Sequence, residues 1–437
     1  MGGRTDTARD AVRVLIDNWH GHATMPSQGL YPHQWSWDSA FIALGLQHWA
    51  GPRAAAELLS LFGAQWADGR IPHIAFNPAI ADHAYFPGPT FWQSDRVAGH
   101  PPIATSGIIQ PPVHAVAVAA IVSGLAPADT AFGAQAYPCL VAQNRYIRER
   151  RTVGDLGLAA VAHPWETGMD NSPAWDTPLH AVPADLTLFE TYTRRDLTHT
   201  GEGERPTDAD YARYIRLALA YRDHDYDDDW LRAAGEFVVV DPAFNALWAW
   251  SELALARISR ILGLDPAPHE AEAARITEAL VAHLWSPDAG IFLARDHVGG
   301  QRLTEVTVGG LVPMLLPGLP SDVAGELVST AQGDCFGVGR PEVLGVPSFD
   351  LSDPRFDPQR YWRGPAWLNT TWLVAEGLAV QGREDLAGRL RSDILALVAQ
   401  SGLREYFNPQ TGTGHGTSDF SWSAAIVLHV LASHADS

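Results

Sequence analysis

Apolar residues recur at the spacing of a helical turn along most of this chain, and this pattern constrains its fold more than any other feature. Between Asp241 and Leu262, Phe244, Leu247 and Trp248 fall on one face of a helix. Similar stretches lie near residues 5–19, 38–50, 52–66, 111–123, 130–150, 208–224, 268–285, 306–331, 364–380, 385–400 and 418–434. About twelve such helices predict an all-α chain that folds as an (α/α)6 barrel, with long loops that form a site.

The sequence shows no division into separate domains. Its 437 residues, of which 46% are hydrophobic, are enough to bury a large core. Pro and Gly are spread along the chain, and we find neither a low-complexity run nor a short repeat. We therefore predict a single domain over residues 1–437.

The charged residues exclude several classes of function. The chain has 30 Lys plus Arg and 50 Asp plus Glu, and the resulting net charge of −20 opposes binding to nucleic acids and anionic membranes. All the basic residues are arginine, because the sequence contains no lysine. A chain without lysine has neither a P-loop nor a lysine that forms a Schiff base with pyridoxal phosphate.

Cysteine usage and the N-terminal sequence bear on the compartment. Cys139 and Cys335 are far apart and form no CxxC pair, so neither a disulfide framework nor a zinc site is indicated. The first residues lack the basic segment and apolar core of an export signal, and no apolar run is long enough to span a membrane. We therefore expect a cytoplasmic protein without a metal or other cofactor, and leave homo-oligomer formation open.

Four short clusters combine aromatic rings with carboxyl groups. They are YPHQWSWD at residues 31–38, WETGMDNSP at 165–173, YWRGPAW at 361–367 and EYFNP at 405–409. Their positions before helices, or in a long irregular region, place them in the loops that build a site. Any single tryptophan is more often part of a core than a sugar platform. Rings beside acids in several loops nevertheless favour a site that holds a sugar and cleaves its glycosidic bond.

Two other patterns are weaker. The acidic run Asp223–Asp228 imitates a calcium loop but lacks its glycine and its final glutamate. Within it, Asp225–Asp228 has the acid pattern of class II terpene cyclases, although a solvated acidic helix end is the favoured interpretation. GTGHG at residues 412–416 lacks the spacing of a dinucleotide turn. We interpret it as a flexible loop that, beside Glu405, can still shape a pocket.

At these motifs the sequence resembles glycoside hydrolase family 63, in particular its bacterial members that hydrolyse mannosylglycerate and glucosylglycerate. The resemblance runs through nearly the whole chain, in the motifs GLYPHQWSWDSAF, IPHI, YFPGP, TSGIIQPPVHA, WETGMDNSPAWD, RPTDADYARY, YWRGPAW, EYFNPQTG and SDFSWSAA. It implies an (α/α)6 barrel and an inverting α-glycosidase, in agreement with the fold predicted from the helices. It also implies that Asp170 is the general acid and Glu405 the general base.

The resemblance further implies a set of substrate-binding residues. Those at the sugar subsite are Tyr31, Trp35, Asp38, Gln110, Trp362, Arg363 and Trp367. The others are Arg205 and Tyr211 at the leaving group, and His73, Tyr85, Trp165 and Tyr361 elsewhere in the pocket. Residues 139–165 and 183–205 depart from the family pattern, so the leaving-group subsite is less defined than the catalytic pair.

The main hypothesis is therefore a cytoplasmic, inverting α-glycosidase that hydrolyses mannosylglycerate or glucosylglycerate. The nearest alternative is an α-glucosidase or α-mannosidase that acts on di- or oligosaccharides. Outside this class, a carbohydrate-binding barrel without activity and a terpene cyclase that uses Asp225–Asp228 stay open. The expected partner is the small glycoside substrate, with no nucleic acid and no membrane.

Overall fold

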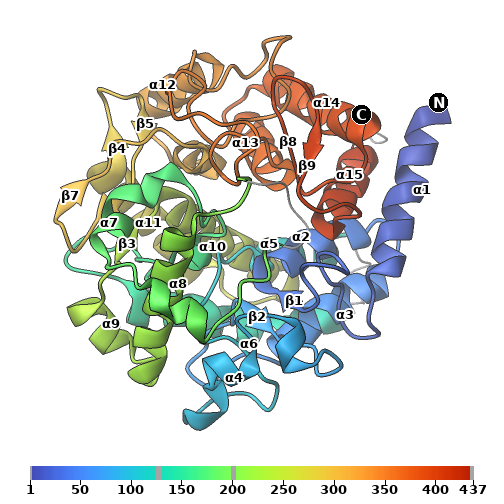
Figure 1. Ribbon diagram of the computed structural model, residues 1–437. Coiled ribbons are helices and arrows are strands. Elements are labelled where there is room, and N and C mark those ends of the chain that lie inside the picture. The colour runs from blue at the N-terminus through green and yellow to red at the C-terminus, as the bar shows by residue number, and fades with distance from the viewer. Residues whose placement is uncertain (1, 125–129, 198–202, 434–437) are drawn as a thin grey trace.

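The computed structural model describes residues 2–124, 130–197 and 203–433, which are mostly helical (Figure 1). The longer helices in this part of the chain are α1 (Gly2–Asp17), α2 (Ser36–Leu46), α3 (Gly51–Phe62), α5 (His114–Ser123), α6 (Ala131–Tyr146), α8 (Asp208–Asp223), α10 (Pro242–Leu262), α11 (Ala267–Leu284), α12 (Ser321–Gln332), α13 (Leu368–Val380), α14 (Glu384–Ser401) and α15 (Ser421–Ser433). The short ones are α4 (Pro89–Trp92), α7 (Asp176–Ala181) and α9 (Asp228–Ala234).

Six inner elements form a closed ring. α2 packs on α5, α5 on α10, α10 on the 3-10 turn Val312–Leu315, that turn on α13, α13 on α15, and α15 on α2. Outside the ring, α1 packs on α15, α3 on α2, α6 on α5, α11 on α10 and α14 on α13, and α12 lies at the periphery (Figure 1). This arrangement is the (α/α)6 barrel, and it confirms the predicted fold.

Most residues of the inner helices are buried, because ring neighbours and the outer helices cover them. Every residue of α2 is buried, for example. α2 and α15 also approach each other closely, since a Cβ at Gly45 would overlap the backbone of Ala425. Only glycine allows two helix backbones this close, so residue 45 fixes one contact of the ring.

One of the predicted helical stretches is divided in the structure. Residues 306–331 form two 3-10 turns, Val308–Gly310 and Val312–Leu315, followed by α12, because Pro317 and Pro320 lack the N–H that a continuous helix needs. α8 is helical as predicted but packs on α4 and α7 instead of joining the ring. The last residue of the predicted stretch 418–434 lies outside the described residues.

Short antiparallel strands tie the connecting segments together. β1 (Gln34–Trp35) pairs with β2 (Ile74–Ala75), so that Trp35 is opposite Ile74. β8 (Tyr406–Phe407) pairs with β9 (Gly414–His415), so that Tyr406 is opposite His415. The other strands are β3 (Val239–Val240), β4 (Trp285–Ser286), β5 (Ile291–Phe292), β6 (Arg295–Asp296) and β7 (Gln301–Arg302). Among the described helices, none is both long and apolar enough to cross a membrane.

Candidate active site

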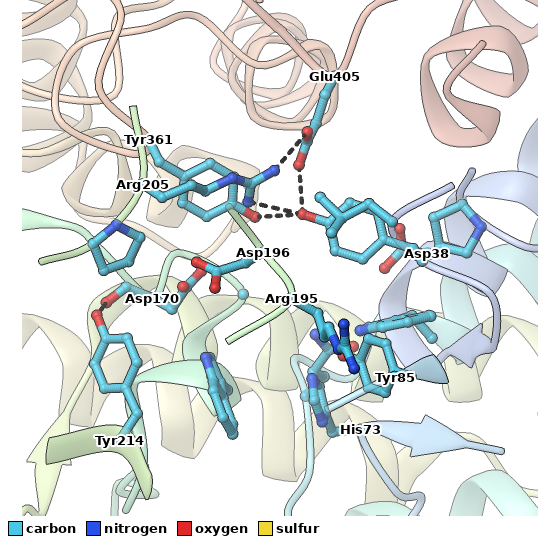
Figure 2. A pocket seen from close by; sticks show the side chains of 18 of the residues that line it. Asp38, His73, Tyr85, Asp170, Arg195, Asp196, Arg205, Tyr214, Tyr361 and Glu405 are labelled. Carbon is cyan, nitrogen blue, oxygen red and sulfur yellow. Dashed lines mark hydrogen bonds and ion pairs between the residues drawn. The ribbon is translucent and has the colours of Figure 1, made fainter. Parts of the chain in front are cut away.

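One pocket, with a volume of about 120 Å3, brings together residues that are far apart in the sequence (Figure 2). Most of the predicted site residues line it, namely Tyr31, Trp35, Asp38, His73, Tyr85, Gln110, Trp165, Asp170, Arg205, Tyr211, Tyr361 and Glu405. They come from the segment before α2 and its first turn, the segments between α3 and α5, the long connection between α6 and α10, and the segments around α13 and α14.

Three donors hold the Glu405 carboxylate, which is buried. Tyr31 Oη donates to Oε1 at 2.8 Å, and Arg205 Nη2 donates to Oε2 at 3.1 Å. The backbone N–H of Thr417 also donates to Oε2 at 3.1 Å. Arg205 Nη1 donates to the Tyr31 hydroxyl at 2.9 Å, and Tyr361 Oη lies 3.5 Å from that hydroxyl (Figure 2). A cation and hydrogen-bond donors stabilise an ionised carboxylate, so this environment suits a base.

Asp170 lies in a contrasting environment. It follows the 3-10 turn Pro164–Thr167, and its backbone carbonyl accepts a hydrogen bond from Tyr214 Oη at 2.9 Å. Burial raises the pKa of the Asp170 carboxyl to about 7, against the attraction of Arg205, and the negative charges of Asp196 and Glu405 also raise it. Such a carboxyl group keeps its proton near neutral pH and can act as an acid.

Aromatic rings form much of the pocket wall. The rings of His73 and Trp165 are within 9° of parallel, with centroids 6.1 Å apart. Trp35 meets Tyr31 edge to face at 5.3 Å and Tyr85 at 5.6 Å. Tyr and Trp rings present flat apolar faces together with polar edges, and both suit the faces and hydroxyl groups of a sugar.

Polar groups between these rings can contact sugar hydroxyls. Asp38 lies in the first turn of α2, and burial raises its pKa well above the usual value for a carboxyl group. Gln110 Oε1 accepts a hydrogen bond from the backbone N–H of Trp37 at 3.2 Å, which orients the amide. Burial lowers the pKa of His73 to about 3, and its Nδ1 has no hydrogen-bond partner within the described residues.

The structure does not bring Trp362, Arg363 and Trp367 to the pocket wall. The two tryptophan rings stack on each other, with centroids 3.9 Å apart, and both are fully buried. Trp367 also packs against Tyr361 at 5.0 Å, so the pair supports a pocket residue from behind. Arg363 forms a bidentate ion pair with Asp176 at the start of α7. The Nε1 groups of both tryptophans and the Nε group of Arg363 are buried without a hydrogen-bond partner within the described residues. None of the three residues lines the pocket, and their place in the sugar subsite stays a prediction.

Several pocket residues were not in the predicted set. They are Pro26, Leu30, Trp37, Phe86, Pro87, Gly168, Arg195, Asp196, Pro206, Tyr214, Phe420 and Trp422. Tyr214 follows Tyr211 by one helical turn of α8, so helical spacing is a signal that predicts it. Arg195 and Asp196 lie in the segment that departs from the family pattern, and the sequence offers no signal for them.

Two alternatives from the sequence can be compared with the structure. For Arg205, the less favoured alternative to a contact with the leaving group is a surface ion pair with Glu202 or Glu204. Arg205 is instead buried against Glu405, while Glu204 accepts a hydrogen bond from Tyr406 Oη at 3.3 Å. Glu202 lies outside the described residues.

The acidic run that resembled a cyclase motif is not fully solvated. Asp228 is buried and pairs with Arg70 and Arg151, each at 3.4 Å. The prediction of a solvated helix end is therefore wrong for Asp228, whose charge two arginines compensate. Across the described residues, no group of three or more His, Cys, Asp or Glu side chains is arranged to hold a metal ion.

Comparison with known proteins decides the family. The model of the mannosylglycerate hydrolase MGH1-like glycoside hydrolase domain matches residues 31–423. A mannosylglycerate hydrolase of Thermus thermophilus is 42% identical over 421 residues, which are 96% of this chain and 99% of that protein. The chain belongs to the MGH1-like glycoside hydrolases of family 63.

Other family members agree with this assignment. The glucosylglycerate hydrolase of Mycolicibacterium hassiacum is 35% identical over 454 residues, covering 98% of each chain. A crystal structure of a family 63 mannosylglycerate hydrolase from Thermus thermophilus, in complex with Tris and D-glycerate, superposes with a TM-score of 0.89. The two share 39% identity, over 97% of this chain and 99% of that one. The MGH1-like chain described here is therefore a glycoside hydrolase.

Proposed function

We propose that this glycoside hydrolase inverts the anomeric centre and hydrolyses mannosylglycerate, glucosylglycerate or both to sugar and glycerate. The names of its near full-length relatives support this substrate class. One observation carries the mechanism. Two carboxyl groups share a pocket but differ in their surroundings: burial raises the pKa of Asp170, whereas Arg205, Tyr31 and the Thr417 amide contact the Glu405 carboxylate.

In this mechanism Asp170 is the general acid and Glu405 the general base. Asp170, whose pKa burial raises to about 7, protonates the departing glycosidic oxygen. Glu405, held in place by Arg205, Tyr31 and the Thr417 amide, takes a proton from the attacking water. A single displacement of this kind needs the two groups on opposite faces of the sugar, about 6.5–9.5 Å apart.

The glycerate carboxylate requires a cation, and the described pocket wall offers Arg205 and Arg195. Arg205 uses Nη1 and Nη2 on Tyr31 and Glu405, whereas its buried Nε has no hydrogen-bond partner in the described part of the chain. We propose that Arg205 links the base to the leaving group, and that Arg195 supplies a second positive charge. Tyr211, which also lines the pocket, would complete this subsite.

A direct assay tests the function. The purified protein is incubated with mannosylglycerate and glucosylglycerate, and with α-linked disaccharides as controls, and released sugar is quantified. We expect glycerate release from at least one of the two, and a loss of at least ~10²-fold in Asp170→Asn and in Glu405→Gln with sugar binding retained. Turnover of disaccharides alone would indicate an oligosaccharide glycosidase, and binding without turnover would indicate a carbohydrate-binding barrel.

The proposal includes a cytoplasmic location. Both cysteines are free thiols, as is usual in a reducing compartment. Cell fractionation with a specific antibody would test it, and recovery of the protein outside the cytoplasmic fraction would contradict it.

A further inference from the structure

The glycine-rich segment 412–416 returns to Glu405 through the hairpin of β8 and β9. Tyr406, next to Glu405, pairs with His415, so residues 416 and 417 are brought beside the carboxylate. The backbone N–H of Glu405 donates to the carbonyl of Thr417 at 3.0 Å. In the opposite direction, the N–H of Thr417 donates to Glu405 Oε2 at 3.1 Å. Thr417 therefore holds both the backbone and the side chain of the same glutamate.

Gly416 makes this approach possible. Its φ is +66°, a left-handed backbone conformation that is energetically unfavourable for residues other than glycine. A Cβ at this position would lie 2.8 Å from Glu405 Cβ and 2.7 Å from Tyr406 Cε1, and it would overlap Glu405 Oε2. Contacts this short do not persist, so any larger residue must displace the carboxylate or the turn. The carboxylate occupies space that is free only because residue 416 has no side chain.

We infer that the Gly416–Thr417 turn is a positioning element for the base of this glycosidase. Arg205 and Tyr31 hold the carboxylate from one direction, and the Thr417 amide fixes Oε2 from the backbone. The inference rests on the proposed role of Glu405. The glycine-rich segment 412–416, which its composition describes only as a flexible loop, would then contribute to catalysis. Because a misplacement of about 1 Å can lower a rate about 10²-fold, a methyl group at residue 416 is expected to act on catalysis.

The same loop offers a matched control. Gly412 has a φ of +72°, close to that of Gly416, so alanine at either position carries a similar backbone cost. The three atoms nearest to a Cβ at Gly412 all belong to the side chain of Gln400, which is exposed and donates to the Thr411 carbonyl at 2.7 Å. Gly412→Ala therefore reproduces the strain without the contact to Glu405. A third variant, Gly416→Asn, restores a residue that tolerates left-handed backbone but keeps the Cβ.

The three variants are compared with the wild type on whichever glycoside the wild type hydrolyses, so a wrong substrate assignment does not affect the result. We expect kcat to fall at least ~10²-fold in Gly416→Ala and in Gly416→Asn, with KM within about threefold of wild type, whereas Gly412→Ala stays within about threefold in both. Similar melting temperatures for the two alanine variants would show that strain is matched. If Gly416→Ala does not accumulate as folded protein, Gly416→Asn carries the comparison.

A glycosyl fluoride then separates the base from the acid. Fluoride departs without a proton from Asp170, but water must still be activated by Glu405. We expect the Gly416 variants to lose as much rate on the fluoride as on the natural glycoside. Near wild-type rates for Gly416→Asn, an equal loss in Gly412→Ala, or full activity of the Gly416 variants on the fluoride would each overturn the inference. In every case the wild-type activity tests the proposed function separately.

Discussion

At the residue scale, the two carboxyl groups of the pocket lie in different environments. Glu405 accepts from a guanidinium, a phenol and an amide, whereas Asp170 is buried with its charge less well compensated. Burial raises the pKa of Asp170 to about 7, so its acidic form is present below that pH and is lost as the pH rises through it.

This difference predicts the pH profile. With a glycerate substrate, kcat/KM should fall on the alkaline side with an apparent pKa of about 7, because the proton for the leaving group is lost there. Substrates with a good leaving group, such as a 2,4-dinitrophenyl glycoside, need this proton less, so their alkaline limb should weaken. An alkaline limb that persists unchanged in Asp170→Asn would assign the ionisation to another group.

Arg205 contacts the base directly, and this changes what its removal is expected to do. Arg205→Ala removes the cation that pairs with the buried Glu405 carboxylate. Removing one partner of a buried ion pair destabilises a protein by on the order of 3–5 kcal/mol, because the other charge is left uncompensated. Turnover should therefore fall for a glycerate substrate and for an uncharged aryl glycoside alike. Any additional loss on the glycerate substrate measures contact with its carboxylate.

Arg195→Ala is the matched control, since Arg195 lines the same pocket. It should lower kcat/KM for the glycerate substrate and leave the aryl glycoside within about threefold, given the about 2 kcal/mol typical of a charged hydrogen bond. An aryl glycoside rate that survives Arg205→Ala would show that the base does not depend on Arg205.

At the element scale, the turn that precedes Asp170 is anchored to the π-helical segment Ile147–Arg151, which follows α6. Glu166, in the 3-10 turn Pro164–Thr167, forms a fully buried ion pair with Arg151. It also accepts hydrogen bonds from the backbone N–H groups of Ala162 at 2.7 Å and Ile109 at 3.2 Å. These contacts join three segments behind the pocket and fix the start of the acid-bearing loop.

Breaking this pair should destabilise the fold. Arg151→Met leaves Glu166 buried without its cation and removes one of the two arginines that pair with Asp228, so the free energy of unfolding should fall by about 3–5 kcal/mol. Arg216→Met is the control, because the Arg216–Glu236 pair is about 40% and 35% exposed and should contribute at most ~1 kcal/mol. Urea denaturation measures both. Equal losses of unfolding free energy in Arg151→Met and Arg216→Met would contradict the anchoring role of the buried pair.

Helical spacing predicted most of the elements that build the ring. The stretch from Asp241 to Leu262 corresponds to α10, which begins at Pro242 because Asp241 caps it with its side chain. Helical spacing cannot distinguish a helix of the barrel from a helix outside it. Residues 208–224 are therefore among the twelve helices predicted for the barrel, although α8 packs on α4 and α7. The spacing also missed that prolines divide residues 306–331 between the inner and the outer layer. Both differences depend on tertiary packing.

At the scale of the whole molecule, the ring closes where the two ends of the chain meet. Arg13 of α1 donates to Asp419 at 2.8 Å, and Asn18 donates to the Ser421 hydroxyl at 2.9 Å. We propose that the chain folds as the single domain expected from its sequence. Calorimetry should then show one transition, with calorimetric and van't Hoff enthalpies equal. Two separable transitions would contradict a single domain.

Most of the residues predicted from the family motifs line the pocket, because the motifs mark the segments that meet there. Motifs do not report which side of a segment a residue occupies. The motifs predict Trp362 and Trp367 as subsite residues, whereas the structure shows their rings stacked on each other behind Tyr361. Nor do motifs show what Arg205 contacts, which depends on a partner two hundred residues along the chain.

The most direct test of the central claim is the anomeric form of the fresh product. Proton NMR follows the sugar released from an α-linked mannosylglycerate or glucosylglycerate before it mutarotates. An acid and a base on opposite faces, with water between them, give a single displacement, so the β-anomer should appear first. First appearance of the α-anomer would require a covalent intermediate, and would contradict the roles proposed for Asp170 and Glu405.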